Sequence, residues 1–413
     1  MGVQCVYAGE ALPSTTTLTF FFAGPTPRAA VGAAALIAWR QDGIAFLETL
    51  DIDCQVLIPE PREGWSPDYD GQITWECEMR ACADIIVFWV DRHLASWRDT
   101  FARWLPRAWR GVGPMPAFTT NIEFGEDLPT GRVVYGRPPS APKNRYLDAR
   151  YREATGWEPC TTLPDTLRAA VKAAGAPAPR TGAARFVPVS VWRTSTFQDW
   201  WTARHAAGHR VDAARVTRCA GSPTPGASPF FWSLWAKIWI PEEERHKENE
   251  VVFGRPDVAC VVPVLTDGST WELAAVEEVR VPAQTASGRV LEWPGGSDPH
   301  GSTDMVAVAL SELEEELGVL GVEPGRLVPV GVRQASATSL AHRIHAYALL
   351  LTYGESQDLR ARAGKVLGAD GEERTRLVLL PVEGWESAPM DWAQLAVGAA
   401  ALRKLRPRKG WFF

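Results

Sequence analysis

The first half of the chain alternates short, wholly apolar runs with longer segments of helical periodicity. An apolar run of five to seven residues predicts a strand that is buried on both faces. Strands that alternate with helices indicate a layered α/β domain with a parallel sheet, whose ligands bind at the carboxyl ends of the strands. The predicted strands are residues 17–23, 54–58, 84–90 and 132–135, and the predicted helices are 29–50, 71–83 and one that opens at 119.

The second half has a different pattern, in which several strands with short turns surround one helix at residues 304–317. This is a mixed α+β pattern. Between the halves, residues 174–184 (AGAPAPRTGAA) have the composition of a linker. We therefore expect a domain at 1–173, a linker at 174–184 and a second domain at 185–413. The predicted strands of the second half are 251–264, 271–281, 290–293, 327–332 and 344–352.

Composition adds bounds on the class of protein. The chain has 413 residues, a formal charge of −6 and 46% hydrophobic residues, so a folded protein of two or three domains is expected. The mild acidity argues against a general nucleic-acid binder. The seven cysteines are scattered and form no CxxC, no basic and apolar leader opens the chain, and no apolar run is long enough to span a membrane. We expect a cytoplasmic protein that does not enter a membrane.

Tryptophan is abundant, with 19 residues in the chain, and six of them gather in segment 185–239. Such a block most simply packs a core. It could also join the two domains, stack a base, or form the interface of a homo-oligomer.

Candidate chemistry in the first half lies where predicted strands end. Gly24-Pro25 follows the first strand, Asp91 follows the strand at 84–90, and Glu123 is placed near a helix start in the segment TTNIEFG. A carboxylate at such a site can attack an anomeric carbon, and a second acid can bind or protonate the departing base. The same residues also fit a turn and a carboxylate that complements the helix dipole.

Five segments in order resemble the nucleoside 2-deoxyribosyltransferase-like family: TFFFAGPTPRA, LIPEPREGW, YDGQITWECEMRACADIIVFWV, MPAFTTNIEFG and VVYGRPPSAPKNRYLD. The resemblance covers about residues 3–171. It implies a flavodoxin-like fold and transfer or hydrolysis of the bond between sugar and base through a covalent glutamate. The roles that it implies are Glu123 as nucleophile, Asp91 as the acid at the base, Gly24 and Pro25 at the sugar, Asn121 and Gln72 as polar contacts, and Arg28 and Arg137 at a 5′-phosphate. Surface ion pairing explains the two arginines equally well.

A run of glutamates marks the second half. Glu312, Glu315 and Glu316 share one face of the predicted helix, where like charges at this spacing destabilise it. A hard divalent cation, Mg²⁺ or Mn²⁺, would remove the conflict and could bridge the oxygens of a diphosphate. The alternative is a solvated acidic face.

This run, with EWPGG before it, resembles the Nudix box G-x5-E-x7-R-E-U-x-E-E-x-G-U, and the flanking strands are most similar to the ADP-ribose pyrophosphatase branch. The resemblance implies a Nudix α/β/α sandwich, metal ligands Glu312, Glu315 and Glu316, and catalysis through Glu315. Ser311 replaces the arginine of the box, its first glutamate is replaced by Ser302 or Thr303, and the loop is one residue longer. Arg280 could contact substrate or be an ordinary charge on a strand surface.

Together these features predict a two-domain enzyme acting on a nucleoside or nucleotide. The first domain would break or exchange an N-glycosidic bond, and the second would hydrolyse a nucleoside diphosphate-X bond with Mg²⁺. The departures from the box leave a second hypothesis open. The second domain would then sense a ligand or act as a scaffold that regulates the first.

Overall fold

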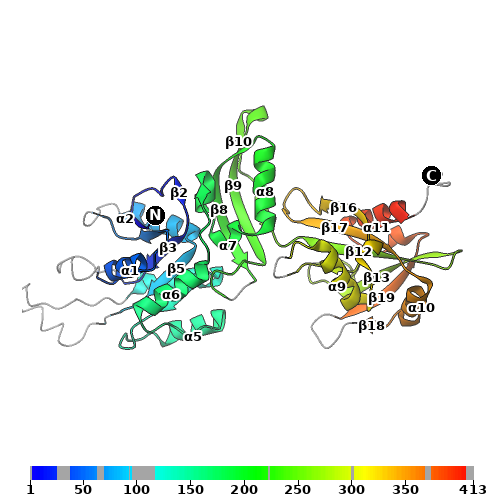
Figure 1. The fold of residues 1–413 in the computed structure, drawn as a ribbon, viewed down its shortest axis with the longest axis horizontal. Helices are drawn as coiled ribbons and strands as arrows, with labels where there is room; N and C mark the ends of the chain where they lie inside the picture. The colour runs from blue at the N-terminus through cyan, green and yellow to red at the C-terminus, as the bar shows by residue number, and fades with distance from the viewer. Residues whose placement is uncertain are drawn as a thin grey trace, which may run out of the picture. The chain divides into compact units, whose positions relative to one another are not determined.

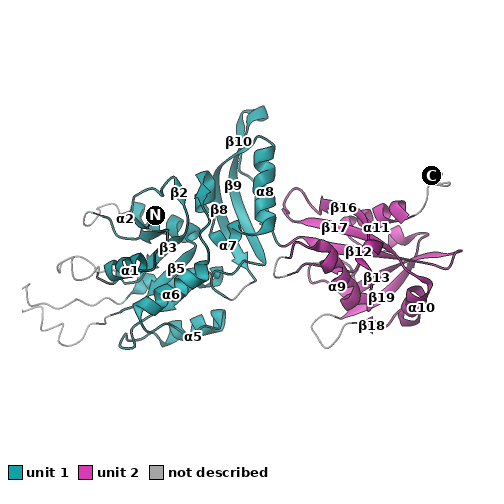
Figure 2. Cartoon of the chain, in the orientation of Figure 1, with its two compact units in different colours: residues 1–255 teal, residues 256–413 magenta. Residues whose placement is uncertain are grey.

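The computed structural model describes residues 2–25, 38–62, 69–92, 94, 117–221, 224–298, 302–367 and 374–405. The chain forms two compact units, Met1–Arg255 and Pro256–Phe413 (Figure 2). The class is mixed α/β, as the sequence predicts, with a parallel sheet in the first unit. No described helix is long and apolar enough to cross a membrane.

Unit 1 is built on a five-stranded parallel sheet of order β1-β4-β3-β5-β6. Apolar side chains fill both of its faces, which explains why the strands read as continuous apolar runs. Helices α2, α4 and α5 cover one face, and α1 and α6 cover the other. The strands are β1 (Val3–Tyr7), β3 (Thr19–Ala23), β4 (Cys54–Ile58), β5 (Ile85–Trp89) and β6 (Val133–Gly136), and the helices are α1 (Ala38–Glu48), α2 (Tyr69–Cys82), α4 (Phe118–Asp127), α5 (Arg145–Thr155) and α6 (Leu163–Ala174).

A second, antiparallel sheet completes unit 1 and takes up the tryptophan-rich block. Helix α8 packs on this sheet through Phe197, which contacts Trp232 at a ring separation of 5.5 Å, and both side chains are fully buried. At Trp232 the tryptophan-rich block therefore packs a core, which is the simplest of the roles expected for it. The elements are β8 (Arg210–Ala220), β9 (Phe231–Ile240), β10 (Arg245–Lys247), β11 (Val251–Gly254), α7 (Val189–Trp192) and α8 (Ser195–Ala206).

The expected linker at 174–184 is instead a packed part of unit 1. It contains β7 (Arg180–Thr181), which pairs with β2 (Thr15–Thr16), and it leads into the 3₁₀ helix η4 (Gly182–Phe186). Arg180 is fully buried, and its guanidinium donates to both carboxylate oxygens of Asp84 at 2.7 and 2.6 Å. The small residues of this segment suggest a linker, but composition does not record the one buried ion pair that fixes the segment to unit 1. The division between the units falls at Arg255/Pro256.

Unit 2 is a mixed sheet of order β16-β17-β12-β13-β19-β18, with helices on both faces (Figure 1). Helices α9 and α10 pack on one face and α11 on the other. The predicted strand 251–264 is two strands, because Pro256 lacks an N–H and separates β11 from β12. The strands are β12 (Val258–Thr266), β13 (Trp271–Val279), β14 (Arg289–Glu292), β15 (Gly295–Gly296), β16 (Val328–Gln334), β17 (Arg343–Leu350), β18 (Val366–Leu367) and β19 (Thr375–Pro381), and the helices are α9 (Met305–Leu317), α10 (Tyr353–Arg362) and α11 (Trp392–Leu405).

Strands β12 and β13 diverge, and this divergence places the glutamate run. They pair only at residues 264–266 with 271–273. Beyond that point β15 pairs with β12, and β14 pairs with β13. Gly295 and Gly296 thus lie in the opening between the two long strands, beneath α9.

Candidate functional sites

The candidate site of unit 1 lies at the carboxyl ends of β3, β4 and β5. Strand β3 lies between β4 and β5. The chain passes from β3 to β4 on one side of it, and then returns to place β5 on the other side. Ligands of open α/β sheets bind at such a reversal of strand order. Gly24 follows β3, Glu60 follows β4 and Asp91 follows β5. Asp91 therefore has the position that the sequence predicts.

Arg40 joins the ends of two of these strands from helix α1. Its Nε donates to the carbonyl of Phe22 and a terminal nitrogen donates to the carbonyl of Gly24, each at 3.2 Å. Its guanidinium also forms an ion pair with Glu60. Arg40 is fully buried, and burial lowers its pKa while Glu60, Glu123 and Glu76 raise it. The positively charged guanidinium of Arg40 is therefore buried at the ends of β3 and β4.

Glu123 lies in this charged cluster and projects from α4. Its pKa is raised to about 7: burial is the largest cause, Glu76 and Asp127 add to the rise, and Arg80 and Arg40 oppose it. Arg80 is held by Asp127 at 2.7 Å and by Glu126 at 3.1 Å. Glu123 lies in the second turn of α4, not near its start as expected, so burial outweighs any benefit from the helix dipole.

Gln72 and Glu76 supply the polar wall on helix α2. The Gln72 amide donates to Oε1 of Glu76 at 2.8 Å and to the carbonyl of Pro59 at 2.6 Å. Burial raises the pKa of Glu76, and Arg40 and Arg80 lower it. The two residues are four apart and share one helix face, so the sequence carried a signal for Glu76 that the prediction missed.

Among the described residues, carboxyls outnumber the arginines of this cluster. The carboxyls of Glu60, Glu76, Glu123 and Asp127 surround the guanidinium groups of Arg40 and Arg80. Burial and neighbouring carboxyls raise the pKa of Glu123 to about 7, so part of the molecules carry a proton on Glu123 near neutral pH. The cluster can therefore offer either a carboxylate or a carboxylic acid to a ligand.

The remaining predicted residues of unit 1 lie around this cluster or apart from it. Gly24 is required because a Cβ there would lie 2.4 Å from the Trp89 carbonyl oxygen, and the buried Pro25 follows it. Asn121 accepts a hydrogen bond from Arg92 at 2.7 Å. Arg137 is paired with Asp148 at 2.7 Å, which is the ion-pair alternative.

Arg28, the other predicted phosphate contact, lies outside the described residues. Sequence reasoning also missed the buried arginines Arg40, Arg80 and Arg92. A lone arginine carries no sequence signal of burial, because arginine is normally exposed.

The candidate site of unit 2 is a group of carboxyls around β15. The backbone N–H of Gly295 donates to Glu316 at 3.0 Å, and a Cβ on Gly296 would lie 2.1 Å from Oε1 of Glu312. Burial raises the pKa of Glu316 to about 8, with Glu312 as the next cause. Two of the predicted glutamates are thus brought together against the two glycines.

Arg280 faces this group from the end of β13. It forms ion pairs with Glu278 at 2.9 Å and with Glu292 at 2.7 Å, and it lowers the pKa of Glu316. Arg280 is thus ion-paired at the edge of the group and partly neutralises it.

Glu315 does not join them. Its side chain is exposed and accepts a hydrogen bond from Ser311 at 2.8 Å. Among the described residues, no group of three or more His, Cys, Asp or Glu is arranged to hold a metal ion. Oxygen donors and excess negative charge in Glu312 and Glu316 suit a hard divalent cation, but the three-glutamate set is not assembled.

No model of a known protein family matches the chain, and a search of curated proteins finds no match either.

Proposed function

We propose that unit 1 breaks or exchanges the N-glycosidic bond of a nucleoside or nucleotide, with a flavodoxin-like fold. The observation that carries this proposal is the half-buried Glu123 beside Glu76 and Arg40, at the reversal of strand order. A glutamate with a pKa of about 7 is ionised in part of the molecules at neutral pH, when it can attack an anomeric carbon.

The chemistry follows from that carboxylate. An oxygen of Glu123 would form an ester to the anomeric carbon as the bond to the base nitrogen breaks. Asp91 would bind or protonate the departing base, and water or a second base would then release the sugar.

The test is release of free base from a panel of nucleosides and nucleoside monophosphates, followed by chromatography. We expect Glu123→Gln to lower the rate by at least about 100-fold. Glu126→Gln is the matched control, since Glu126 lies on the same helix with a largely exposed side chain paired to Arg80. Equal rates in wild type and Glu123→Gln would refute the proposal.

We further propose, as a second function, that unit 2 is a Nudix sandwich that binds a nucleoside diphosphate-X compound together with Mg²⁺ or Mn²⁺. Its support is the pair Glu312 and Glu316 at the two glycines, with the raised pKa of Glu316. These two carboxylates would hold the cation, which supplies charge to a diphosphate when bound. Arg280 would face the substrate.

The exposed Glu315 favours keeping the alternative, a sensing or scaffold module, beside hydrolysis. Two measurements separate them: cleavage of ADP-ribose, and the shift of melting temperature on adding Mg²⁺. Hydrolysis predicts both signals, each lost in Glu316→Gln and kept in Glu314→Gln, an exposed residue of the same helix. Stabilisation by Mg²⁺ without cleavage would support sensing, and the absence of both signals would refute hydrolysis and sensing and favour a scaffold.

A further inference from the structure

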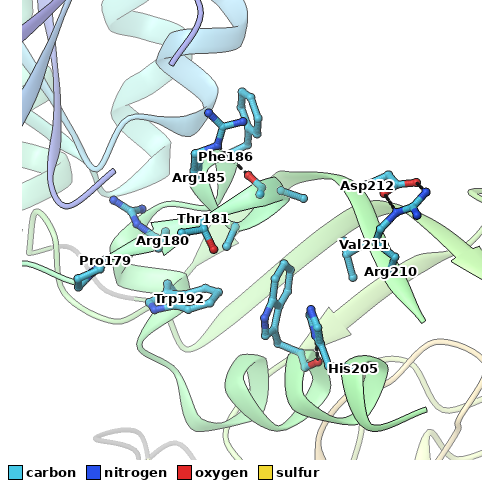
Figure 3. A pocket seen from close by; sticks show the side chains of 14 residues that line it. Pro179, Arg180, Thr181, Arg185, Phe186, Trp192, His205, Arg210, Val211 and Asp212 are labelled. Carbon is cyan, nitrogen blue, oxygen red and sulfur yellow. Dashed lines mark hydrogen bonds and ion pairs between the residues drawn. The ribbon is translucent and has the colours of Figure 1, made fainter. Parts of the chain in front are cut away.

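Unit 1 contains a cavity of about 420 Å³ that the proposed glycosidic site does not use. It is lined by residues of segment 179–186, by α7 and α8, and by the start of β8. In Figure 3, Phe186 and His205 lie on opposite sides of it, with Arg210 and Asp212 at one end. None of the residues in the Glu123 cluster lines it. The volume is that of pockets that take small organic ligands.

Aromatic rings form one wall of this cavity. The ring of Trp201 lies 5.5 Å from that of Trp192 and 4.9 Å from the imidazole of His205. Behind them the buried Phe197 stacks on Trp201 at 5.9 Å with an interplanar angle of 20°. The rings are therefore held in place before any ligand arrives, and Trp192 and Trp201 remain only half-buried.

The arginines of the cavity are already engaged. Arg180 is paired with Asp84, and Arg210 with Asp212 at 2.5 Å. Arg185 donates to the carbonyls of Gly182 and Leu12 at 2.9 and 2.8 Å. Asp84 and Asp212 offset the charges of Arg180 and Arg210, so the cavity presents little unbalanced positive charge, which favours an uncharged ligand.

His205 gives the cavity a defined polar group. Its Nδ1 lies 2.9 Å from the carbonyl oxygen of Trp201, and since a carbonyl can only accept, Nδ1 carries the proton. In the neutral ring, Nε2 is then an acceptor that can receive a hydrogen bond from a ligand N–H. The carboxylate of Asp212 already accepts from Arg210 and lies 2.8 Å from Nε2 of His246, and its remaining lone pairs make it a second acceptor. Arg210 keeps the pKa of Asp212 low, at about 2.

We propose that this cavity binds a neutral, planar heteroaromatic ring that carries N–H donors. The rings of Trp192 and Trp201 lie edge to face at 72°, so the ligand would stack on one of them and meet the edge of the other. A free nucleobase has this chemistry, because its π-face stacks on tryptophan and its edge donates to acceptors. The inference stands on the cavity itself and holds whether or not unit 1 cleaves nucleosides.

The test is binding of free adenine to the full-length protein by isothermal titration calorimetry, with ribose 5-phosphate as a probe that lacks the ring. We expect adenine to bind, and Trp201→Leu and His205→Ala each to weaken it by about tenfold or more. Trp200→Leu is the matched control, because Trp200 is the neighbouring residue of the same helix and does not line the cavity. His205 is exposed, so its variant tests the site even if Trp201→Leu unfolds.

Glu123→Gln separates this site from the glycosidic site and should leave adenine binding unchanged. Loss of binding in Glu123→Gln alone would assign adenine to the other site and overturn the inference. No detectable adenine binding, equal weakening by Trp200→Leu, or tighter binding of ribose 5-phosphate than of adenine would also overturn it.

Discussion

At the scale of single residues, the side chains with the largest consequences are the carboxyls that the fold partly removes from water. Glu123 and Glu316 have pKa values raised to about 7 and about 8. In both, burial is the first cause and neighbouring carboxyls add to it. These two carboxyls are also candidate functional groups, and strongly shifted pKa values are common at functional sites.

Glu123 makes the stability of unit 1 depend on pH. Its pKa in the folded state lies above its unfolded value of 4.5, so it favours folding below about pH 4.5. That contribution is lost as the pH rises through about 7. Glutamine cannot ionise, so Glu123→Gln does not undergo this loss. The free energy of unfolding of the variant minus that of wild type should therefore rise by up to about 3 kcal/mol from about pH 5 to about pH 8. Urea unfolding at the two pH values, with amide exchange of α4 identifying the transition of unit 1, measures it. Glu126→Gln, with an exposed side chain, should show a smaller gain, and an equal gain would contradict the cause.

The buried pair Asp84 and Arg180 is the second residue-scale case. Asp84 also accepts from the backbone N–H groups of Thr19 and Val189 at 2.8 and 2.6 Å. Arg180→Met should destabilise unit 1 by about 3–5 kcal/mol, because it leaves a buried carboxylate without its cation. Adding Asp84→Asn should recover part of that loss, and a double mutant as unstable as the sum of the single variants would contradict the coupling. Denaturant unfolding of the three variants decides.

At the scale of elements, close approach of backbone and ring determines how α11 docks on its sheet. A Cβ on Gly398 would lie 2.5 Å from the ring of Trp385 and 2.6 Å from that of Trp293. Both rings are buried, and they lie 5.6 Å apart. The helix thus depends on glycine at a place where alanine would otherwise be the better helix former.

This contact predicts opposite effects for one substitution at two helical positions of unit 2. Gly398→Ala should lower the melting temperature of unit 2, since packed rings must move and overpacking costs about 1–3 kcal/mol. Gly354→Ala in α10 meets nothing within 4 Å and should stabilise by about 0.5–1 kcal/mol. Calorimetry of both variants measures this, and stabilisation by both would show that α11 is not docked as described.

At the scale of the whole molecule, the position of the boundary between the units has a practical consequence. The segment after 174 supplies β7, Arg180 and the second sheet to unit 1. A fragment of residues 1–173 should therefore fail to fold, because Asp84 would be buried without Arg180. Fragments 1–255 and 256–413 should each unfold cooperatively. Circular dichroism and urea titration of the three fragments test this, and a cooperative 1–173 fragment would favour the boundary suggested by composition.

Much of the architecture could be predicted from apolar periodicity. The strands at β3 to β6 and the helix α9 lie within a few residues of their predicted bounds, because a strand buried on both faces and an amphipathic helix each leave a local pattern. Strand β8, helix α11 and the break at Pro256 were missed or misplaced. Strand β8 is largely exposed, helix α11 is rich in alanine, and the strand predicted at 251–264 is divided by a single proline, so the local pattern is weak in each case.

The candidate sites divide in the same way. Glu123, Asp91, Glu312 and Glu316 could be chosen from the sequence because carboxylates at strand ends and on one helix face are local facts. The burial of Arg40, the pairing of Arg137 with Asp148, and the exposure of Glu315 could not. Each depends on which distant segment lies beside the residue.

The sequence by itself therefore determined the mixed α/β class, the main strands and the candidate carboxyls, since these depend on spacing along the chain. Only the tertiary structure decided where unit 1 ends, which carboxyls share a desolvated place, and that segment 179–212 encloses a cavity. Ion pairing, desolvation and enclosure arise between residues far apart in the chain, and no local pattern records them.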